Sequence, residues 1–146
     1  MRKINAAYLA GLIDGEGSIF VQRVKTRNKK MSRSGFHYRA GFAITMTDLK
    51  TVEWCARTTG CGRVSSPRHC KRNHRPGHRW SVWSKQSSAL LLLLLPYLRL
   101  KKPHAANLIK FQSRMGVAGR FGNSKLEILR RERHRQISLV LNKRGR

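Results

Sequence analysis

Acidic residues are scarce in this chain of 146 residues, which has 6 Asp and Glu against 32 Lys and Arg and a formal net charge of +26. Self-repulsion on this scale opposes a compact state, and binding to a polyanion relieves it. The charge therefore points to a nucleic acid as partner, well ahead of an anionic membrane surface. Because Lys and Arg occur from Arg2 to Arg146, we expect a broad binding face and not a single basic tail.

Cysteines and long apolar runs are also few. The 3 cysteines are an odd number at irregular spacing, which argues against a disulfide framework and for a reducing compartment. The longest apolar run, residues 89–95, is far shorter than the roughly 20 residues that span a bilayer, and no secretory signal is visible. We expect a soluble, intracellular protein without a membrane partner. The sequence does not tell a bacterial or phage-infected cytoplasm from an organelle.

Residues 4–14 predict a helix with two unlike faces. One face carries the large apolar side chains Tyr8, Leu9, Leu12 and Ile13. The opposite face carries the small or acidic residues Ala7, Ala10, Gly11 and Asp14. The first face requires a core, and the second allows another backbone to approach closely, so we expect the helix to be buried on both sides. Gly15 and Gly17 are expected to end it.

The rest of the chain predicts an α+β fold. Alternation predicts strands at 18–24, 36–46, 63–66 and 79–84, in two hairpins with basic loops. Asp48 is expected to cap a helix over 49–58. Further helices are predicted from Ser87 or Ser88 to about 95, where the leucine run should be core, and over 104–115 and 124–141. One domain over 1–146 is expected, with an antiparallel four-stranded sheet packed on helices, a core over about 4–115 and a basic helical extension over about 116–146.

Two of the six acids, Asp14 and Glu16, lie at the end of the first helix. Carboxylates are disfavoured at the negative end of a helix dipole, so a cation must compensate them: an Arg, a Lys or a divalent metal. Next to a phosphate backbone a hard cation such as Mg²⁺ suits carboxylate oxygens, and it can activate water for phosphodiester hydrolysis.

Strand parity indicates which side chains face a nucleic acid. Phe20, Gln22 and Val24 share the exposed face of the first strand, and residues 39, 41, 43, 45 and 47 share that of the second. The expected base readers are Gln22, Arg39, Thr45 and Arg63. Phosphate contacts are expected from Lys25, Arg27, Lys29 and Lys30, and Arg68 and Arg79 are further expected DNA-binding residues.

A second cluster combines Cys61 with His69, Cys70, His74 and His78. Its composition is compatible with structural zinc, but no Cys-x₂-Cys pair exists and four of the five lie in an arginine-rich hairpin loop. Phosphate contacts or plain loop positions are the favoured interpretation. Trp80 and Trp83 have opposite parity on one strand, so one is expected in the core and the other on the exposed face.

Residues 9–17, Leu-Ala-Gly-Leu-Ile-Asp-Gly-Glu-Gly, resemble the LAGLIDADG motif of a family of homing endonucleases. The segments 60–64 and 95–102 and the Ala-Asn-Leu at 106–108 are similar to single-motif members encoded in group I introns. The resemblance covers about residues 4–115. It implies an αββαββα fold with a saddle-shaped sheet in the DNA major groove. It also implies a homodimer through the motif helices, with Ala7, Ala10, Gly11 and Asp14 at the interface.

The same resemblance implies roles for single residues. Glu16 matches the metal-binding acid, where many members have Asp, and the carbonyl of Gly15 matches a second metal ligand. Asp14 matches the first acid, as much architectural as metal-binding, and Lys101 matches a basic residue near the scissile phosphate, with Lys102 as fallback. Asp48 lies near a position that orients water in relatives, although a helix cap is its favoured role.

The function that the resemblance implies is a sequence-specific homing endonuclease that breaks both strands of a long, pseudo-palindromic DNA site. The expected cofactor is Mg²⁺, with Mn²⁺ able to replace it and Ca²⁺ able to bind without supporting cleavage. The alternative is a protein of the same fold that binds nucleic acid without cutting, either an RNA maturase or an inactive DNA binder. A ribosomal-type RNA-binding protein would explain the charge but not the acids that end an apolar helix.

Overall fold

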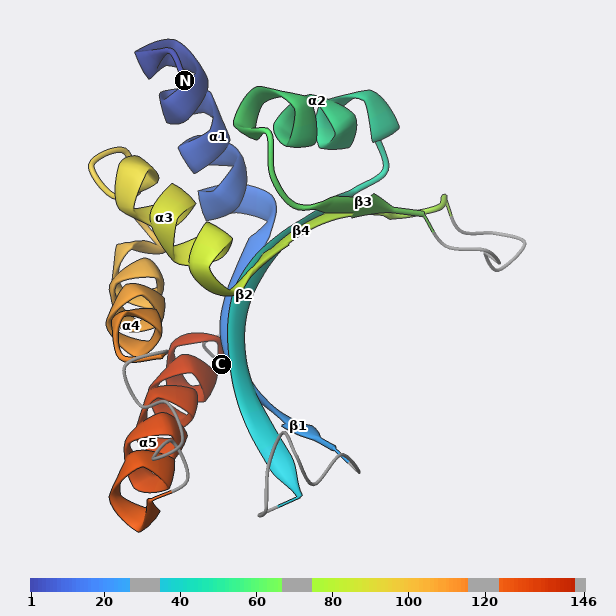
Figure 1. Cartoon of the computed structure of the whole chain (residues 1–146). Helices are drawn as coiled ribbons and strands as arrows, with labels where there is room; N and C mark the ends of the chain where they lie inside the picture. Colours follow the sequence, from blue (N-terminus) through green and yellow to red (C-terminus); the bar gives the residue numbers. More distant parts are fainter. Residues whose placement is uncertain (27–34, 67–74, 116–123, 144–146) are drawn as a thin grey trace.

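The computed structural model describes residues 1–26, 35–66, 75–115 and 124–143, which form a strongly curved sheet with helices on its convex side (Figure 1). The elements in chain order are α1 (Lys3–Glu16), β1 (Gly17–Lys25), β2 (Phe36–Met46), α2 (Leu49–Thr59), β3 (Arg63–Ser65), β4 (His78–Trp83), α3 (Ser84–Leu94), α4 (Lys102–Ser113) and α5 (Lys125–Leu141). The predicted αββαββα order is confirmed for the first seven elements, and α4 and α5 follow them.

The sheet is antiparallel throughout, in the order β1-β2-β4-β3. Gly17 pairs with Ile44 and Lys25 with Phe36, so β1 and β2 form a long hairpin that bends away from the helices (Figure 1). The concave face carries no helix of the described chain (Figure 1). No helix in the described ranges is long and apolar enough to cross a membrane.

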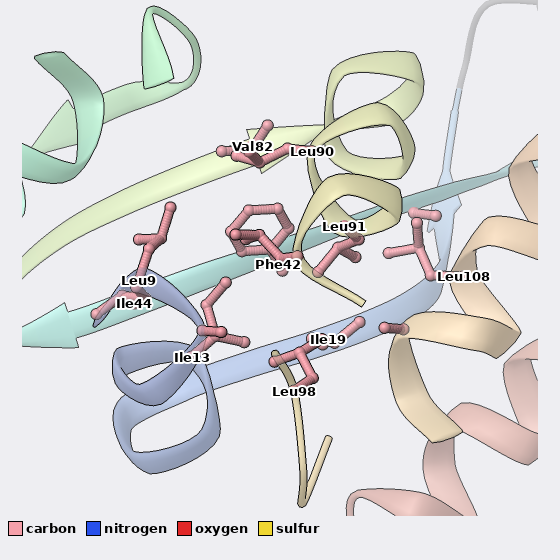
Figure 2. Close-up of a cluster of buried hydrophobic side chains, with 14 of the residues drawn as sticks. Leu9, Ile13, Ile19, Phe42, Ile44, Val82, Leu90, Leu91, Leu98 and Leu108 are labelled. Atoms are coloured by element: carbon pink, nitrogen blue, oxygen red, sulfur yellow. The ribbon is translucent and has the colours of Figure 1, made fainter. Parts of the chain in front are cut away.

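The core fills the space between the convex face of the sheet and the helices. In Figure 2, Leu9 and Ile13 of α1 meet Ile19 of β1 and Phe42 and Ile44 of β2. Leucines of α3 and α4 close the cluster from the other side, and Trp80 packs edge-to-face on Phe42 with ring centroids 5.4 Å apart. Trp80 is therefore the core tryptophan of β4, and Trp83 lies on the opposite face.

Helix α1 is rotated relative to the sequence prediction. Its buried residues are Ala6, Leu9, Ala10 and Ile13, while Tyr8 is 53% exposed and contacts Trp54 of α2 edge-to-face at 5.2 Å. The predictions that Tyr8 belongs to the core and that Ala10 faces a second copy are therefore wrong. Small residues at positions 6 and 10 let the helix lie close on the sheet, whereas the prediction assigned the largest side chains to the core.

Two helix boundaries also differ from the predictions. Helix α1 continues through Gly15 to Glu16 and ends at Gly17, whose added Cβ would lie 2.5 Å from the carbonyl oxygen of Ile13. Helix α3 begins at Ser84, directly after β4, and not at Ser87 or Ser88. In the leucine run, Leu92 and Leu93 are 59% and 64% exposed, so the prediction that the whole run is core is wrong for these two residues.

Helix α5 docks on the edge strand β1 through polar groups. The buried backbone N–H of Val21 donates to Ser138 Oγ at 3.1 Å, and Asn142 Nδ2 donates to the carbonyl oxygen of Ile19 at 2.9 Å. These bonds satisfy ladder groups that an edge strand leaves unpaired. The apolar side chains of Leu126, Leu129 and Val140 on α5 are exposed.

Candidate active site and nucleic-acid interface

The end of α1 brings the two motif acids to the point where β1 begins. Glu16 is the last residue of the helix and is exposed. Its side chain has no hydrogen bond or ion pair within the described part of the chain. The other five acids are all engaged: Asp14 and Asp48 with backbone N–H groups, Glu53, Glu127 and Glu132 with arginines. Among the acidic side chains, Glu16 is thus the one that the described ranges leave available for an external cation.

Asp14 points to a neighbouring loop. Its Oδ2 accepts the backbone N–H of Arg99 at 2.7 Å, and its Oδ1 accepts that of Lys101 at 2.8 Å. The carboxylate thereby fixes the segment between α3 and α4 against the end of α1. This arrangement supports the architectural role of Asp14 and gives no support to the predicted role as a metal ligand.

Lys101 supplies a cation at the same place. Its Nζ donates to the carbonyl oxygen of Asp14, one of the last carbonyls of α1. A lysine at a helix C-terminus complements the negative end of the dipole. The cation that the sequence required beside the motif acids is therefore present within the protein, and it binds the carbonyl of Asp14, two residues before Glu16. Lys102, the fallback, is exposed at the start of α4.

The donors available to a metal are oxygens. The carboxylate of Glu16 and the carbonyl of Gly15, in the last turn of α1, form a set that suits a hard cation such as Mg²⁺. No group of three or more His, Cys, Asp or Glu residues in the described ranges could hold a metal by itself. Magnesium commonly binds through one or two carboxylates with substrate phosphates and water, so the donors present fit such a partial site.

Asp48 serves as the N-cap of α2. Its Oδ2 accepts the backbone N–H of Thr51 at 2.8 Å, and these bonds to Thr51 hold the pKa of Asp48 below its usual value. The cap was the favoured interpretation of this residue, and it is confirmed. A share for Asp48 in orienting water stays a prediction.

The concave face of the sheet carries most of the predicted DNA-binding residues that the structure describes. Thr45 of β2 lies opposite Arg79 of β4, and Arg63 of β3 lies opposite Ser81. By the alternation of the strands, all four side chains belong to the face that does not pack on the core. Lys25 has the opposite parity, together with Arg23, which pairs with Glu132 of α5 at 3.8 Å. Lys25 therefore does not share the concave face of the sheet, and its predicted phosphate contact from the end of β1 stays a prediction.

Several predicted residues lie outside the described residues. These are Arg27, Lys29, Lys30 and Arg68, together with His69, Cys70 and His74 of the Cys/His cluster. Of that cluster the structure describes His78, whose Nδ1 lies 2.7 Å from Ser66 Oγ, and Cys61, which is half-buried. The third cysteine of the chain, Cys55, is buried, and this burial raises the pKa of its thiol to about 11, so it is not a nucleophile at neutral pH.

Aromatic residues gather at the centre of the concave face, which the sequence prediction did not include as a unit. The ring of Trp83 packs edge-to-face on Phe20 at 5.2 Å, and the guanidinium carbon of Arg39 lies 4.0 Å above the Trp83 ring. The signal for this cluster was Gly41, because a glycine inside a strand often marks a close approach of another group.

The α1 surface that does not face the core is apolar. Ile4 is 74% exposed, Ala7 and Gly11 are exposed, and Asp14 is half-buried beneath the loop that it binds. Three of the four residues predicted at a dimer interface therefore lie outside the core of their own chain, and Ala10 does not.

Comparison with known proteins agrees with this geometry. The family model of the LAGLIDADG endonucleases matches residues 9–113, and no curated protein matched the chain. Among solved structures, the homing endonuclease I-CvuI, seen with DNA and Mg or Ca, superposes with a TM-score of 0.79 at 20% identity over 99% of this chain and 85% of its own.

Two further structures have the same fold. The archaeal intron-encoded homing endonuclease I-Vdi141I, complexed with DNA, gives a TM-score of 0.77 at 16% identity, over 98% of this chain and 87% of its own. I-SmaMI, bound to cleaved DNA, gives 0.70 at 19% identity over 94% of this chain but only 44% of its own. By the family match, which spans most of its length, the chain belongs to the LAGLIDADG endonuclease family.

Proposed function

We propose that this protein is a sequence-specific, metal-dependent DNA endonuclease that acts as a homodimer and cuts both strands of a pseudo-palindromic site. The observation that carries the proposal is the state of Glu16. It is the one acid of the described chain without a partner, and it is exposed at the end of α1, where Lys101 binds the carbonyl of Asp14. An unpaired carboxylate there would repel a phosphate backbone unless a cation bridged the two.

The metal would be held by the Glu16 carboxylate and the Gly15 carbonyl, completed by phosphate oxygens and water. Bound there, Mg²⁺ supplies Lewis-acid polarisation of the phosphate and a water of lowered pKa. Mn²⁺ should replace it, and Ca²⁺ should support binding without cleavage. I-CvuI has been seen on its target with Ca and uncleaved on another target with Mg, which supports the use of a divalent ion in this fold.

The residues of the protein supply positioning and charge. Lys101 is held at the end of α1 by its bond to the Asp14 carbonyl, and this position supports a role for its ammonium in stabilising the negative charge of a phosphate bound near Glu16. The curvature of the sheet suits a major groove, and Thr45, Arg63 and Arg79 present hydrogen-bonding groups on that face.

The homodimer is supported by the exposed apolar surface of α1 and by the length of I-SmaMI. The match with I-SmaMI spans 94% of this chain but only 44% of the longer I-SmaMI chain. The rest of I-SmaMI is long enough for a second copy of the same unit. A two-fold pairing of α1 helices would bring two Glu16 side chains to the two scissile phosphates, one for each strand.

A cleavage assay tests the proposal. A library of long randomised duplexes is incubated with the wild-type protein and Mg²⁺, and the double-strand ends are sequenced, with EDTA as the metal-free control. We expect recurrent cut sites with Mg²⁺ and none with EDTA. Glu16→Gln should lower cleavage of a recovered site at least about 10²-fold and retain binding in Ca²⁺, whereas Glu53→Gln on α2 should cleave normally.

Specific binding without any Mg²⁺-dependent cleavage would instead favour a non-cutting nucleic-acid-binding protein. Glu16→Asp adds a geometric test, because the shorter side chain keeps the ligand but shifts the metal. If Glu16→Gln cut as fast as the wild type, Glu16 would not be the metal-binding acid.

A further inference from the structure

The aromatic cluster on the concave face depends on Gly41, which has no side chain. At Gly41 an added Cβ would lie 2.7 Å from Cε3 of Trp83 and 2.6 Å from the carbonyl oxygen of Val82. Trp83 is the cross-strand partner of Gly41, so the indole lies directly over the bare backbone of β2. Glycine at this position therefore lets a large aromatic ring lie flat on the centre of the sheet.

The indole is fixed from a second side as well. Phe20, which pairs with Gly41 across the β1–β2 ladder, contacts the Trp83 ring edge-to-face at 5.2 Å. Trp83 is half-buried between these neighbours, although it belongs to the face that carries no helix. The result is a rigid aromatic platform in the middle of the proposed DNA-binding surface.

Arg39 is held on this platform by two different contacts. Its guanidinium carbon lies 4.0 Å from the centroid of the Trp83 ring, a cation–π stack. With the Gln22 amide oriented so that its oxygen faces the guanidinium, Oε1 accepts from Arg39 Nε at 2.7 Å and from Nη2 at 2.8 Å. Gln22 is the cross-strand partner of Arg39, so β-sheet register brings the two together.

These contacts leave the outer end of the guanidinium free to bind. Arginine has five N–H donors in a planar fork, and the Gln22 oxygen takes only the Nε–H and one Nη2–H. The remaining Nη1–H and Nη2–H groups form the end-on pair that can donate to two acceptors at once. In the major groove, guanine presents O6 and N7 as such a pair, and Arg to guanine is the commonest specific contact.

We infer that Arg39 is a pre-organised guanine reader, with Trp83 and Gln22 as the positioning residues that hold its guanidinium. The inference rests on the proposed DNA-binding function and adds to it a base identity and a mechanism of selectivity. An arginine whose rotamers are already fixed loses little conformational entropy on binding, so the contact contributes more to discrimination than a free surface arginine would. In a two-fold dimer the preference recurs once in each half-site.

The position of Arg39 and Gln22 relative to the scissile phosphate follows from the distance between Glu16 and Gln22 along β1. Gln22 is six residues beyond Glu16 along β1. At roughly 3.3 Å per residue this is about 20 Å, comparable to about six base pairs at roughly 3.4 Å each. The guanine should therefore lie inside the half-site, within about six base pairs of the scissile phosphate, and not in the flanks.

The test compares base preferences of variants on randomised DNA. Duplexes bound in Ca²⁺ are captured and sequenced for the wild type, Arg39→Lys, Trp83→Phe and Trp83→Leu, and thermal unfolding confirms that each variant folds. For the wild type we expect one symmetric pair of G·C positions with a preference of roughly 5- to 150-fold. Arg39→Lys keeps the charge but loses the planar fork, so it should lose this preference and no other, with an unchanged salt dependence.

The two Trp83 variants distinguish a role of the aromatic face from a role of side-chain bulk alone. Trp83→Phe keeps an aromatic face and should retain most of the preference, whereas Trp83→Leu should reduce it at the same base pair only. An Arg39→Lys profile identical to that of the wild type, or a uniform loss of binding across all sequences, would overturn the inference and leave the proposed endonuclease intact. Absence of any base preference in the wild type would instead overturn the proposed function.

Discussion

Asp14 shows how a motif acid can fix a neighbouring loop. Both of its carboxylate oxygens accept backbone N–H groups, from Arg99 and Lys101, and its own carbonyl accepts the Lys101 ammonium. The residue therefore fixes both the backbone and the side chain of the proposed phosphate-binding lysine. Glu16, two positions later, is left free for the cation.

We expect Asp14→Asn to destabilise the protein by about 1–3 kcal/mol, because one of the two loop N–H groups would face an amide NH₂ instead of an oxygen. Urea unfolding monitored by fluorescence measures the change. Cleavage should fall as Lys101 loses its position, but the Mg²⁺ concentration for half-maximal rate should not move.

The magnesium dependence distinguishes this role from metal ligation. For Glu16→Asp, which alters a proposed ligand, that midpoint should shift while stability stays near the wild-type value. A large shift in the Mg²⁺ midpoint for Asp14→Asn, with little loss of stability, would place Asp14 in the metal shell after all.

Single residues were predictable from the sequence where the cause was local. The Asp48 cap and the end of α2 at Gly60, which has a φ of 64°, depend on neighbours a few positions away. The rotation of α1 was not predictable, because both of its faces are apolar and only the sheet beneath decides which one packs. The Arg39–Trp83 stack depends on the register of β2 and β4. The hydrophobic pattern alone does not define this register residue by residue.

At the scale of elements, the extent of α5 was predictable from the sequence, but its docking was not. Its predicted span, 124–141, differs by one residue from the observed Lys125–Leu141. The helix docks through the polar residues Ser138, Asn142 and Glu132. Polar docking leaves no periodic signature, since each contact depends on an unpaired group of the edge strand or on one side chain such as Tyr38.

Glu132 makes this docking sensitive to acid. Its Oε2 accepts from the Tyr38 hydroxyl at 2.6 Å, and its Oε1 accepts from Arg135 Nη1 and Gln136 Nε2. Burial opposes the charge, but the bonds from Tyr38, Gln136 and Arg135 outweigh it and lower the pKa of Glu132. Because the folded pKa is depressed, the stabilising effect is complete above the unfolded value and is lost as pH falls through the folded value.

We therefore expect the stability of the wild type to decline as the pH falls below about 4.5, with part of the decline due to Glu132. In Glu132→Gln the free energy of unfolding should be lower at neutral pH and should change less over that acid range. Urea unfolding at a series of pH values measures both slopes. Glu53→Gln is the matched control, since its carboxylate pairs with Arg57 on the surface of α2 and should alter neither. Equal acid slopes for wild type and Glu132→Gln would show that the network does not anchor α5.

At the scale of the whole molecule, composition predicted the partner class and the motif predicted the fold. A polyanion on the concave face would relieve the excess of 26 positive charges, since five of the six acids are used inside the protein. What composition could not predict is the surface by which two copies would meet, because that surface is defined by which α1 residues the core leaves outside.

Gly11 offers a selective test of that pairing. It is exposed in the middle of α1, and an added Cβ would have no atom within 4 Å, so a side chain there costs the single chain nothing. Replacing a glycine inside a helix even favours the helix by up to about 1 kcal/mol. Gly11→Gln should thus keep or slightly raise the stability of the monomer, yet its side chain would hold two α1 helices apart.

Sedimentation of Gly11→Gln should therefore show a monomer at concentrations where the wild type is a dimer, and double-strand cleavage of a recovered site should be lost. Ser113→Gln, a change of similar size at the exposed end of α4, should leave both properties as in the wild type. If Gly11→Gln sedimented and cleaved as the wild type does, the two copies could not meet through this face of α1. The two Glu16 side chains would then have to reach the two DNA strands without a pairing of the α1 helices.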